Sequence, residues 1–311
     1  MTSMFNDHRW ELRDYPLLFE ARKASERGIT RHSLLHTPRY PVVVPGIRMD
    51  RETFVRFRTP IWADHSWQRD ALRFRAALMK HPSIVAGHAL AARLYGWPLP
   101  TNLMTDQLHV CTAEPNARII QPLITLHRSK NFSQRMWFDL PILDAVDVFI
   151  GVGPDLLLHD LVKLGDAAIG NWHGRPQADL KELQTQVTER SFLRRRAHLL
   201  AAIDLMRPTV DSPAETDLRL WAIAVGLPEP VVHPQIHCPS LNWIVEPDLG
   251  YPDKKLALEY EGDHHRASKR QWTRDIERDE ALRNEDWTVL KVTSRTNYRQ
   301  LEAKIRLHLG L

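Results

Sequence analysis

The strongest constraint on how this chain folds is a turn flanked by two strand-like runs in its last third. Residues 243–250 and 255–262 each have the composition of a short strand. Pro252-Asp253 stands between them, and both residue types favour a turn. The pattern therefore predicts a β-hairpin, and with it a sheet in this part of the chain.

Alternation along the second strand of this hairpin divides its side chains between two faces. One face carries Leu256, Leu258 and Tyr260, and the other carries Ala257, Glu259 and Glu261. A loop of two or four residues pairs Asp248 with Ala257 or Glu259, and either pairing puts Asp248 on the acidic face. A loop of three or five residues breaks this arrangement.

Three carboxylates on one strand face repel one another unless a cation lies between them. Hard oxygen ligands suit Mg²⁺ or Mn²⁺, so Asp248, Glu259 and Glu261 are the expected metal ligands. The alternative is an exposed strand with solvated acids, against which the apolar half of the strand argues. His264 and His265 follow directly and are candidates for a catalytic base or a phosphate contact.

The hairpin belongs to an expected domain over 211–311. Ser212 and Glu215 have the spacing of a capping box, which predicts that a helix starts between them. That helix is expected over 213–225. The other expected elements are a helix over 268–284, a strand over 287–293 and a helix over 297–309. Asp279 stands on an apolar helix face, either paired with Arg278 or facing the metal.

The first 60 residues show the pattern of a short winged helix-turn-helix. We expect a helix over 17–27, a second helix over 31–36 capped by Thr30, and a strand over 42–44. Short helix pairs are common, so the pattern also fits a plain pair of helices.

Residues 61–210 form a second expected region with both helices and strands. The elements predicted in it are helices over 71–79, 88–95 and 156–168 and strands over 108–111 and 119–127. A basic helix over 178–206 follows and contains Arg194, Arg195 and Arg196. These arginines form either a solvated helix face or a contact to phosphate.

Charge is divided unevenly along the chain. Residues 212–311 hold 14 Lys and Arg against 16 Asp and Glu, a net of −2, and the remaining residues hold 28 against 22, a net of +6. If DNA is bound, its phosphates therefore contact mainly the front. No membrane span or signal peptide is visible, and Cys111 and Cys238 are far apart, so we expect a cytoplasmic protein with free thiols.

Several spaced motifs in residues 212–309 resemble a family. The stretches are Ser212-Pro-Ala-Glu215, Gly226-Leu-Pro-Glu-Pro230, Asp248, Leu258-Glu-Tyr-Glu-Gly-Asp-His-His265, Arg278-Asp279 and Trp287-Thr-Val-Leu290. This region resembles an uncharacterised bacterial family related to the very short patch repair endonuclease, within the PD-(D/E)XK nuclease group. The resemblance implies an α/β/α fold and Mg²⁺-dependent hydrolysis of DNA.

The resemblance also implies a role for single residues. Asp248 matches the central metal-ligand aspartate, and Glu259 takes the acid position of the nuclease motif. Glu261 stands where the patch-repair enzyme has a histidine and where the general motif has a lysine, so this chain departs from the standard pattern. Asp279 matches the acid of the following helix. Glu215 resembles the first-helix glutamate of such nucleases, although capping explains it equally well.

The front resembles a second family. The stretches that match are Thr30-Arg-His32, Gly46-Ile-Arg-Met49, Gly87-His-Ala-Leu-Ala-Ala-Arg-Leu-Tyr-Gly-Trp-Pro-Leu-Pro100, Leu108-His-Val110 and Asp160-Leu161. They resemble the AbiEi type of antitoxin and transcriptional regulator, which has an N-terminal winged helix and is paired with a nucleotidyltransferase toxin. The resemblance implies DNA contacts by Arg31 and His32.

Together these features predict a multi-domain α+β protein. It has a winged-helix-like region at 1–60, an AbiEi-like α/β region at 61–210 and a PD-(D/E)XK-like domain at 211–311. The expected function is a Mg²⁺- or Mn²⁺-dependent DNA endonuclease or nickase, targeted by its front. The alternative is an antitoxin-like regulator whose nuclease fold is catalytically idle, and an intact set of acids argues against it because unused buried acids cost stability.

Overall fold

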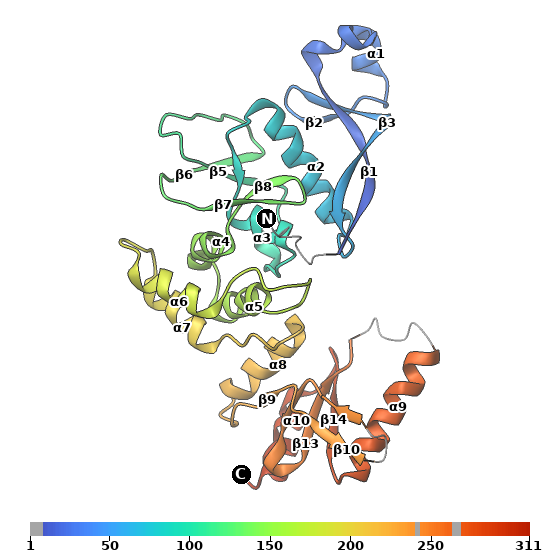
Figure 1. The fold of residues 1–311 in the computed structure, drawn as a ribbon, viewed down its shortest axis with the longest axis vertical. Coiled ribbons are helices and arrows are strands. Elements are labelled where there is room, and N and C mark those ends of the chain that lie inside the picture. The colour runs from blue at the N-terminus through green and yellow to red at the C-terminus, as the bar shows by residue number, and fades with distance from the viewer. Residues whose placement is uncertain (1–8, 240–242, 263–268) are drawn as a thin grey trace, which may run out of the picture. The chain divides into compact units, whose positions relative to one another are not determined.

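The computed structural model describes residues 9–239, 243–262 and 269–311 and divides the chain into two compact units (Figure 1). Unit 1 comprises Met1–Ile169 and His173–Leu205, and unit 2 comprises Gly170–Trp172 and Met206–Leu311. Helices and several separate sheets occur in both units, so the chain is of the α+β class. Each unit is described by itself below.

Unit 1 begins with a sheet in which two long strands pair. Strand β1 (Trp10–Glu20) runs antiparallel to β3 (Ile47–Pro60), and β2 (Val42–Val44) lies on the other side of β3. The short helix α1 (Arg31–His36) connects β1 to β2. Its expected cap is confirmed, because Thr30 Oγ1 accepts a hydrogen bond from a backbone N–H in the first turn.

The helix expected over 17–27 is wrong. Residues 17–20 belong to β1 and pair with 47–50, and 3₁₀ turns at Ala21–Lys23 and Ser25–Arg27 follow. The apolar run Leu17-Leu18-Phe19 is compatible with either structure, and pairing along the length of β3 favours the strand. Residues 9–60 therefore contain no pair of α-helices that would form a helix-turn-helix.

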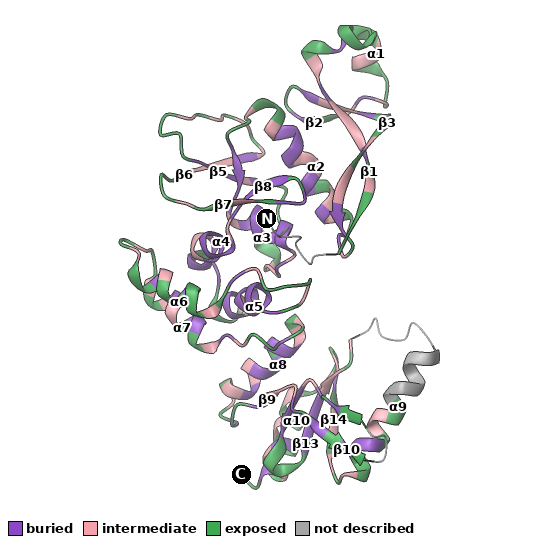
Figure 2. Ribbon diagram, in the orientation of Figure 1, coloured by how far each residue is buried: buried purple, intermediate pink, exposed green. Residues whose placement is uncertain are grey.

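A second sheet forms the centre of unit 1, with strand order β6-β5-β4-β8-β7. Its strands are β4 (Val85–Ala86), β5 (Leu108–Thr112), β6 (Ile124–Arg128), β7 (Gln134–Trp137) and β8 (Leu140–Leu143). The helices around it are α2 (His65–Lys80), α3 (His88–Tyr95), α4 (Ala145–Val152) and α5 (Leu158–Ile169). Most of α3 is buried, as Figure 2 shows in purple.

The single basic helix expected over 178–206 is also wrong. The structure has two helices, α6 (Leu180–Glu189) and α7 (Arg196–Leu205), separated by a turn. Phe192 and Arg195 in this turn have φ values of +57° and +52°. Non-glycine residues with these left-handed angles do not continue an α-helix, so the chain breaks here.

Unit 2 is built on a four-stranded mixed sheet of order β14-β13-β12-β9. The strands are β9 (Val231–Val232), β12 (Leu249–Tyr251), β13 (Leu256–Tyr260) and β14 (Thr288–Val292), and a separate pair is formed by β10 (Ile236–Cys238) and β11 (Trp243–Val245). The helices are α8 (Pro213–Ala224), α9 (Lys269–Asn284) and α10 (Tyr298–Leu309). Strands β13 and β14 are parallel, and the other neighbours are antiparallel.

Side chains pack on both faces of this sheet, because neighbouring residues of β13 point in opposite directions. On one face, Leu256 and Leu258 join α8 and α10 in a buried apolar cluster. On the other face, Val289 packs against a smaller cluster formed by α9, β10 and β11. The apolar face predicted for β13 is thus confirmed, and the acidic face lies on the side of α9.

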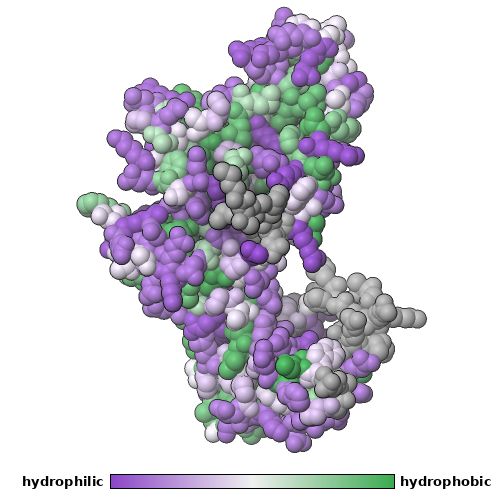
Figure 3. Space-filling model, viewed as in Figure 1, coloured by the Kyte–Doolittle hydropathy of each residue, from purple (hydrophilic) through white to green (hydrophobic). Residues whose placement is uncertain are grey.

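The surface of both units is mainly hydrophilic in the view of Figure 3, with hydrophobic patches between polar side chains. Among the described residues, no helix combines the length and the apolar character that are needed to cross a lipid bilayer.

Candidate metal centre

The structure determines the register of the β12–β13 hairpin, which depends on a loop length that the sequence left open. Tyr251 pairs with Leu256 and Leu249 pairs with Leu258, so the loop has four residues and Asp248 comes opposite Glu259. Asp248 Oδ2 accepts a hydrogen bond of 2.7 Å from the backbone N–H of Tyr260. This bond fixes the carboxylate at the end of the hairpin.

The single strand expected over 243–250 is divided in the structure. Residues 243–245 form β11 and pair with β10, whereas 249–251 form β12 in the four-stranded sheet. Pro247 lies between them and has no backbone N–H to donate to a ladder, which accounts for the break. Asp248 therefore lies at the point where the chain leaves one sheet for the other.

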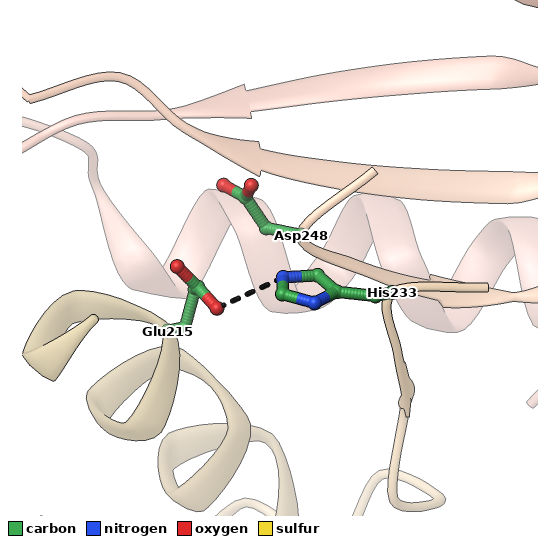
Figure 4. Close-up of side chains that lie close together, drawn as sticks. All are labelled: Glu215, His233 and Asp248. Carbon is green, nitrogen blue, oxygen red and sulfur yellow. Dashed lines mark ion pairs between the residues drawn. The ribbon is translucent and has the colours of Figure 1, made fainter. Parts of the chain in front are cut away.

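Three side chains converge at this point in unit 2. Glu215 of α8, His233 after β9 and Asp248 before β12 each offer a ligand atom, and these atoms lie within 4.8 Å of one another (Figure 4). Two of the three were expected from the sequence, Glu215 as a first-helix acid and Asp248 as the central ligand. Glu259 and Glu261 are not part of this group.

Glu215 has a structural role as well as a place in the centre. Its carboxylate accepts hydrogen bonds from the Asp211 N–H at 3.0 Å and from Ser212 Oγ at 2.7 Å, and its own N–H donates to Ser212 Oγ. The N-cap predicted at Ser212 is thus confirmed, and the Glu215 carboxylate returns to the start of α8 through the Asp211 N–H and Ser212 Oγ. The same carboxylate lies 3.1 Å from His233 Nε2, which links the start of the helix to the cluster.

His233 was missed by the sequence analysis. It lies in a loop with a φ of +43°, and its backbone N–H donates to the Asp248 carbonyl at 3.1 Å. A left-handed histidine is uncommon, and such backbone strain is found preferentially at functional sites. The sequence offered one weak signal, a histidine beside a proline directly after a short strand.

Burial and neighbouring charges shift the pKa values of the side chains at and near this centre. Burial raises the pKa of Asp248, and the nearby Glu215 raises it further. Burial also raises the pKa of Glu259, although Arg278 partly opposes the effect. The hydrogen bond to Glu215 raises the pKa of His233. Each acid is held in a place where a positive charge would stabilise its ionised form.

The donor atoms of Glu215, His233 and Asp248 fit a divalent metal ion. Two carboxylates and one imidazole supply oxygen and nitrogen donors, a set that suits Mn²⁺ or Zn²⁺ better than Mg²⁺, which prefers oxygen alone. Glu259 lies outside this group, and its buried Oε1 accepts no hydrogen bond among the described residues. Arg278 Nη2 lies 3.2 Å from it, close enough for an ion pair but without hydrogen-bond geometry.

Glu261 and Asp279 form ion pairs with a lysine. Lys291 Nζ is 2.9 Å from Glu261 Oε1 and 2.8 Å from Asp279 Oδ2. Burial tends to lower the pKa of Lys291, but the two carboxylates outweigh it and raise the pKa above its ordinary value. The structure thus pairs Glu261, expected as a ligand, with an ammonium group.

The other expected site residues come from several parts of the sequence. His264 and His265 fall outside the described residues. Arg31 and His32 are exposed on α1. The three consecutive arginines at the start of α7 all contact groups of unit 1: Arg194 pairs with Asp155, Arg195 donates to the Pro154 carbonyl, and Arg196, the first residue of α7, donates to the Arg190 carbonyl.

Unit 1 contains a cavity of about 1200 Å³ that is separate from this centre. His88, His127, Arg128 and Arg190 are among its lining residues. Arg190 forms an ion pair with Asp147, and Arg128 donates to a backbone carbonyl. Its arginines are thus already partnered, and among the described residues the cavity gives no comparable group of candidate ligands.

The pairing of His233 with Glu215 predicts a pH dependence of stability in the metal-free protein. A raised pKa in the folded state means that protonated His233 stabilises the fold below about pH 6.5, and that this contribution is lost as the pH rises through the raised pKa. We expect the difference in unfolding free energy between wild type and His233→Gln to be largest near about pH 6 and to shrink above it.

Urea unfolding at a series of pH values measures this difference. The matched control replaces His237, an exposed histidine on β10, with glutamine. A difference between wild type and His233→Gln that stays constant from about pH 5 to about pH 9 would contradict the role given to the pair.

Comparison with known proteins leaves the chain without an assigned family. No family model matches it, and no curated protein matches it. Among solved structures it is similar to the crystal structure of the RV2827C protein from Mycobacterium tuberculosis, with a TM-score of 0.39 and 13% sequence identity. That match covers 74% of this chain and 86% of the other. A TM-score this low assigns no function.

Proposed function

We propose that unit 2 is a metal-dependent phosphodiesterase of the PD-(D/E)XK type that hydrolyses DNA. The observation that carries the proposal is the convergence of Glu215, His233 and Asp248 at the end of a hairpin whose second strand presents Glu259 opposite Asp248. A mixed sheet with helices on both faces is compatible with this fold type.

Each residue has a distinct part in this proposal. Glu215, His233 and Asp248 would hold a divalent ion, which supplies an activated water and stabilises the leaving oxygen when bound. Glu259 is a buried carboxylate with a raised pKa, and such a group is suited to accept a proton from the attacking water. Arg278 lies beside Glu259 and offers a positive charge toward a phosphate.

DNA is the proposed substrate because of the charge division along the chain. The residues before Ser212 have a net charge of +6, whereas residues 212–311 have a net of −2. A basic segment joined to an acidic centre allows phosphates to be attracted by the front while the acids hold a cation.

The proposal is tested by incubating the full chain with supercoiled plasmid and Mn²⁺ or Mg²⁺. We expect conversion to nicked or linear DNA, and loss of this conversion in Glu259→Ala, because the group that accepts the proton is removed. Glu277→Ala is the matched control, since Glu277 is exposed on α9. A wild-type protein that binds the ion but leaves the plasmid intact would favour a catalytically idle regulator.

A further inference from the structure

The ammonium group of Lys291 occupies a site made of carboxylates. Lys291 lies on β14 in register with Glu259 on the neighbouring parallel strand β13, so the two side chains are on the same face of the sheet. Its Nζ atom contacts Glu261 at 2.9 Å and Asp279 of α9 at 2.8 Å. The cation on β14 thus joins the residue that directly follows β13 to a residue of α9.

These contacts are made by the kind of group that holds a hard metal ion. Carboxylates from separate elements that converge on one point are the usual ligands of Mg²⁺ and Mn²⁺. The Asp279 side chain is only 13% exposed, so its charge needs a partner. Lys291 supplies that partner from within the chain.

The charge balance around Lys291 agrees with this reading. Glu259, Glu261 and Asp279 contribute −3, and Arg278 and Lys291 contribute +2, which leaves a net of −1. Without the charge of Lys291 the net is −2, which equals the charge that one divalent ion neutralises. Lys291 and a second ion are therefore alternatives for the same carboxylates.

We propose that Lys291 is a built-in cation that takes the place of a second metal ion, so that unit 2 binds a single divalent ion. Many phosphodiesterases use two ions about 3.5–4 Å apart, one on each side of the reacting phosphate. Here the first position belongs to Glu215, His233 and Asp248, and the ammonium group fills the acidic position formed by Glu261 and Asp279. The first position rests on the proposed function, whereas the role of Lys291 does not.

The number of Mn²⁺ ions bound by the full chain tests this proposal. We expect calorimetric titration to give one ion per wild-type chain and one additional ion in Lys291→Met, which keeps the unbranched chain except for its terminal atom and removes its charge. Lys291→Gln is a second neutral variant in case the first does not fold. Lys304→Met is the matched control, because Lys304 is exposed on α10, and it should bind as many ions as wild type.

A double variant locates the additional ion. Glu261→Gln introduced into Lys291→Met removes one of the freed carboxylates and should return the count to that of wild type. Two ions in the wild-type chain, or no additional ion in either neutral variant that folds, would overturn the proposal.

The same titration separates the two proposals. If wild type binds no ion and Lys291→Met binds one, the centre at Asp248 is wrong and the role of Lys291 stands. If wild type binds one ion that Asp248→Asn removes, and the neutral lysine variants add none, the centre stands and the role of Lys291 is wrong.

Discussion

Asp248→Asn should bind Mn²⁺ about 100-fold more weakly than wild type, or not measurably. Loss of residues that only orient metal ligands already costs about 10–100-fold in affinity, and Asp248 is a proposed ligand itself. Asparagine retains the shape and an oxygen that can accept the Tyr260 N–H, so the hairpin should persist. The change therefore removes charge from the centre and little else.

Calorimetric titration with Mn²⁺ measures this effect on the full chain. The matched control is Asp253→Asn, because Asp253 is exposed in the loop of the same hairpin. Equal Mn²⁺ affinities for wild type and Asp248→Asn would contradict the proposed metal centre. Thermal unfolding of both variants without metal shows whether the fold is retained.

Asp70→Ala should destabilise unit 1 by about 3–5 kcal/mol, the usual cost of removing one partner from a buried ion pair. Asp70 Oδ2 and Arg93 Nε are 2.6 Å apart, and the two side chains are only 2% and 5% exposed. Alanine would leave the Arg93 guanidinium buried, with the backbone carbonyls of Leu103 and Gln107 as its remaining acceptors among the described residues. Urea unfolding of the full chain, monitored through the unfolding transition of unit 1, measures the loss of stability.

An exposed pair of the same sheet-and-helix unit is the appropriate comparison. Arg56 Nε is 3.0 Å from Asp14 Oδ1, but the side chains are 67% and 58% exposed. Solvent screens such pairs, so Asp14→Ala should cost less than about 1 kcal/mol. Similar small losses in both variants would show that the Asp70 pair contributes no more than a surface contact.

Features that depend on a few neighbouring residues could be predicted from the sequence. The caps at Thr30 and Ser212 involve side chains three residues from their partners, and both are present. The apolar face of β13 followed from alternation alone. Only the length of one loop had to be known to place Asp248 on the same face as the glutamates. The structure has four residues in this loop, which is one of the two lengths that give this arrangement.

Features that depend on pairing between distant strands could not be predicted. His233 reaches the centre because the residue before it pairs with Leu249 on β12, and no local pattern shows this. Lys291 meets Glu261 only through the parallel register of β13 and β14. The helix expected over 17–27 is wrong for the same reason, since a partner strand some thirty residues later determines the structure of that segment.

Glu215 begins a helix and also forms one side of the candidate centre. At an ordinary capping box, glutamate can be exchanged for glutamine, because either side chain can return a hydrogen bond to the start of the helix. Here such an exchange would remove a charge from the centre while α8 remained intact. Substitutions that are chosen to improve helix capping and raise thermal stability would thus have to leave Glu215 unchanged. A substitution that is neutral at most capping positions would not be neutral here, because it would alter the candidate metal centre.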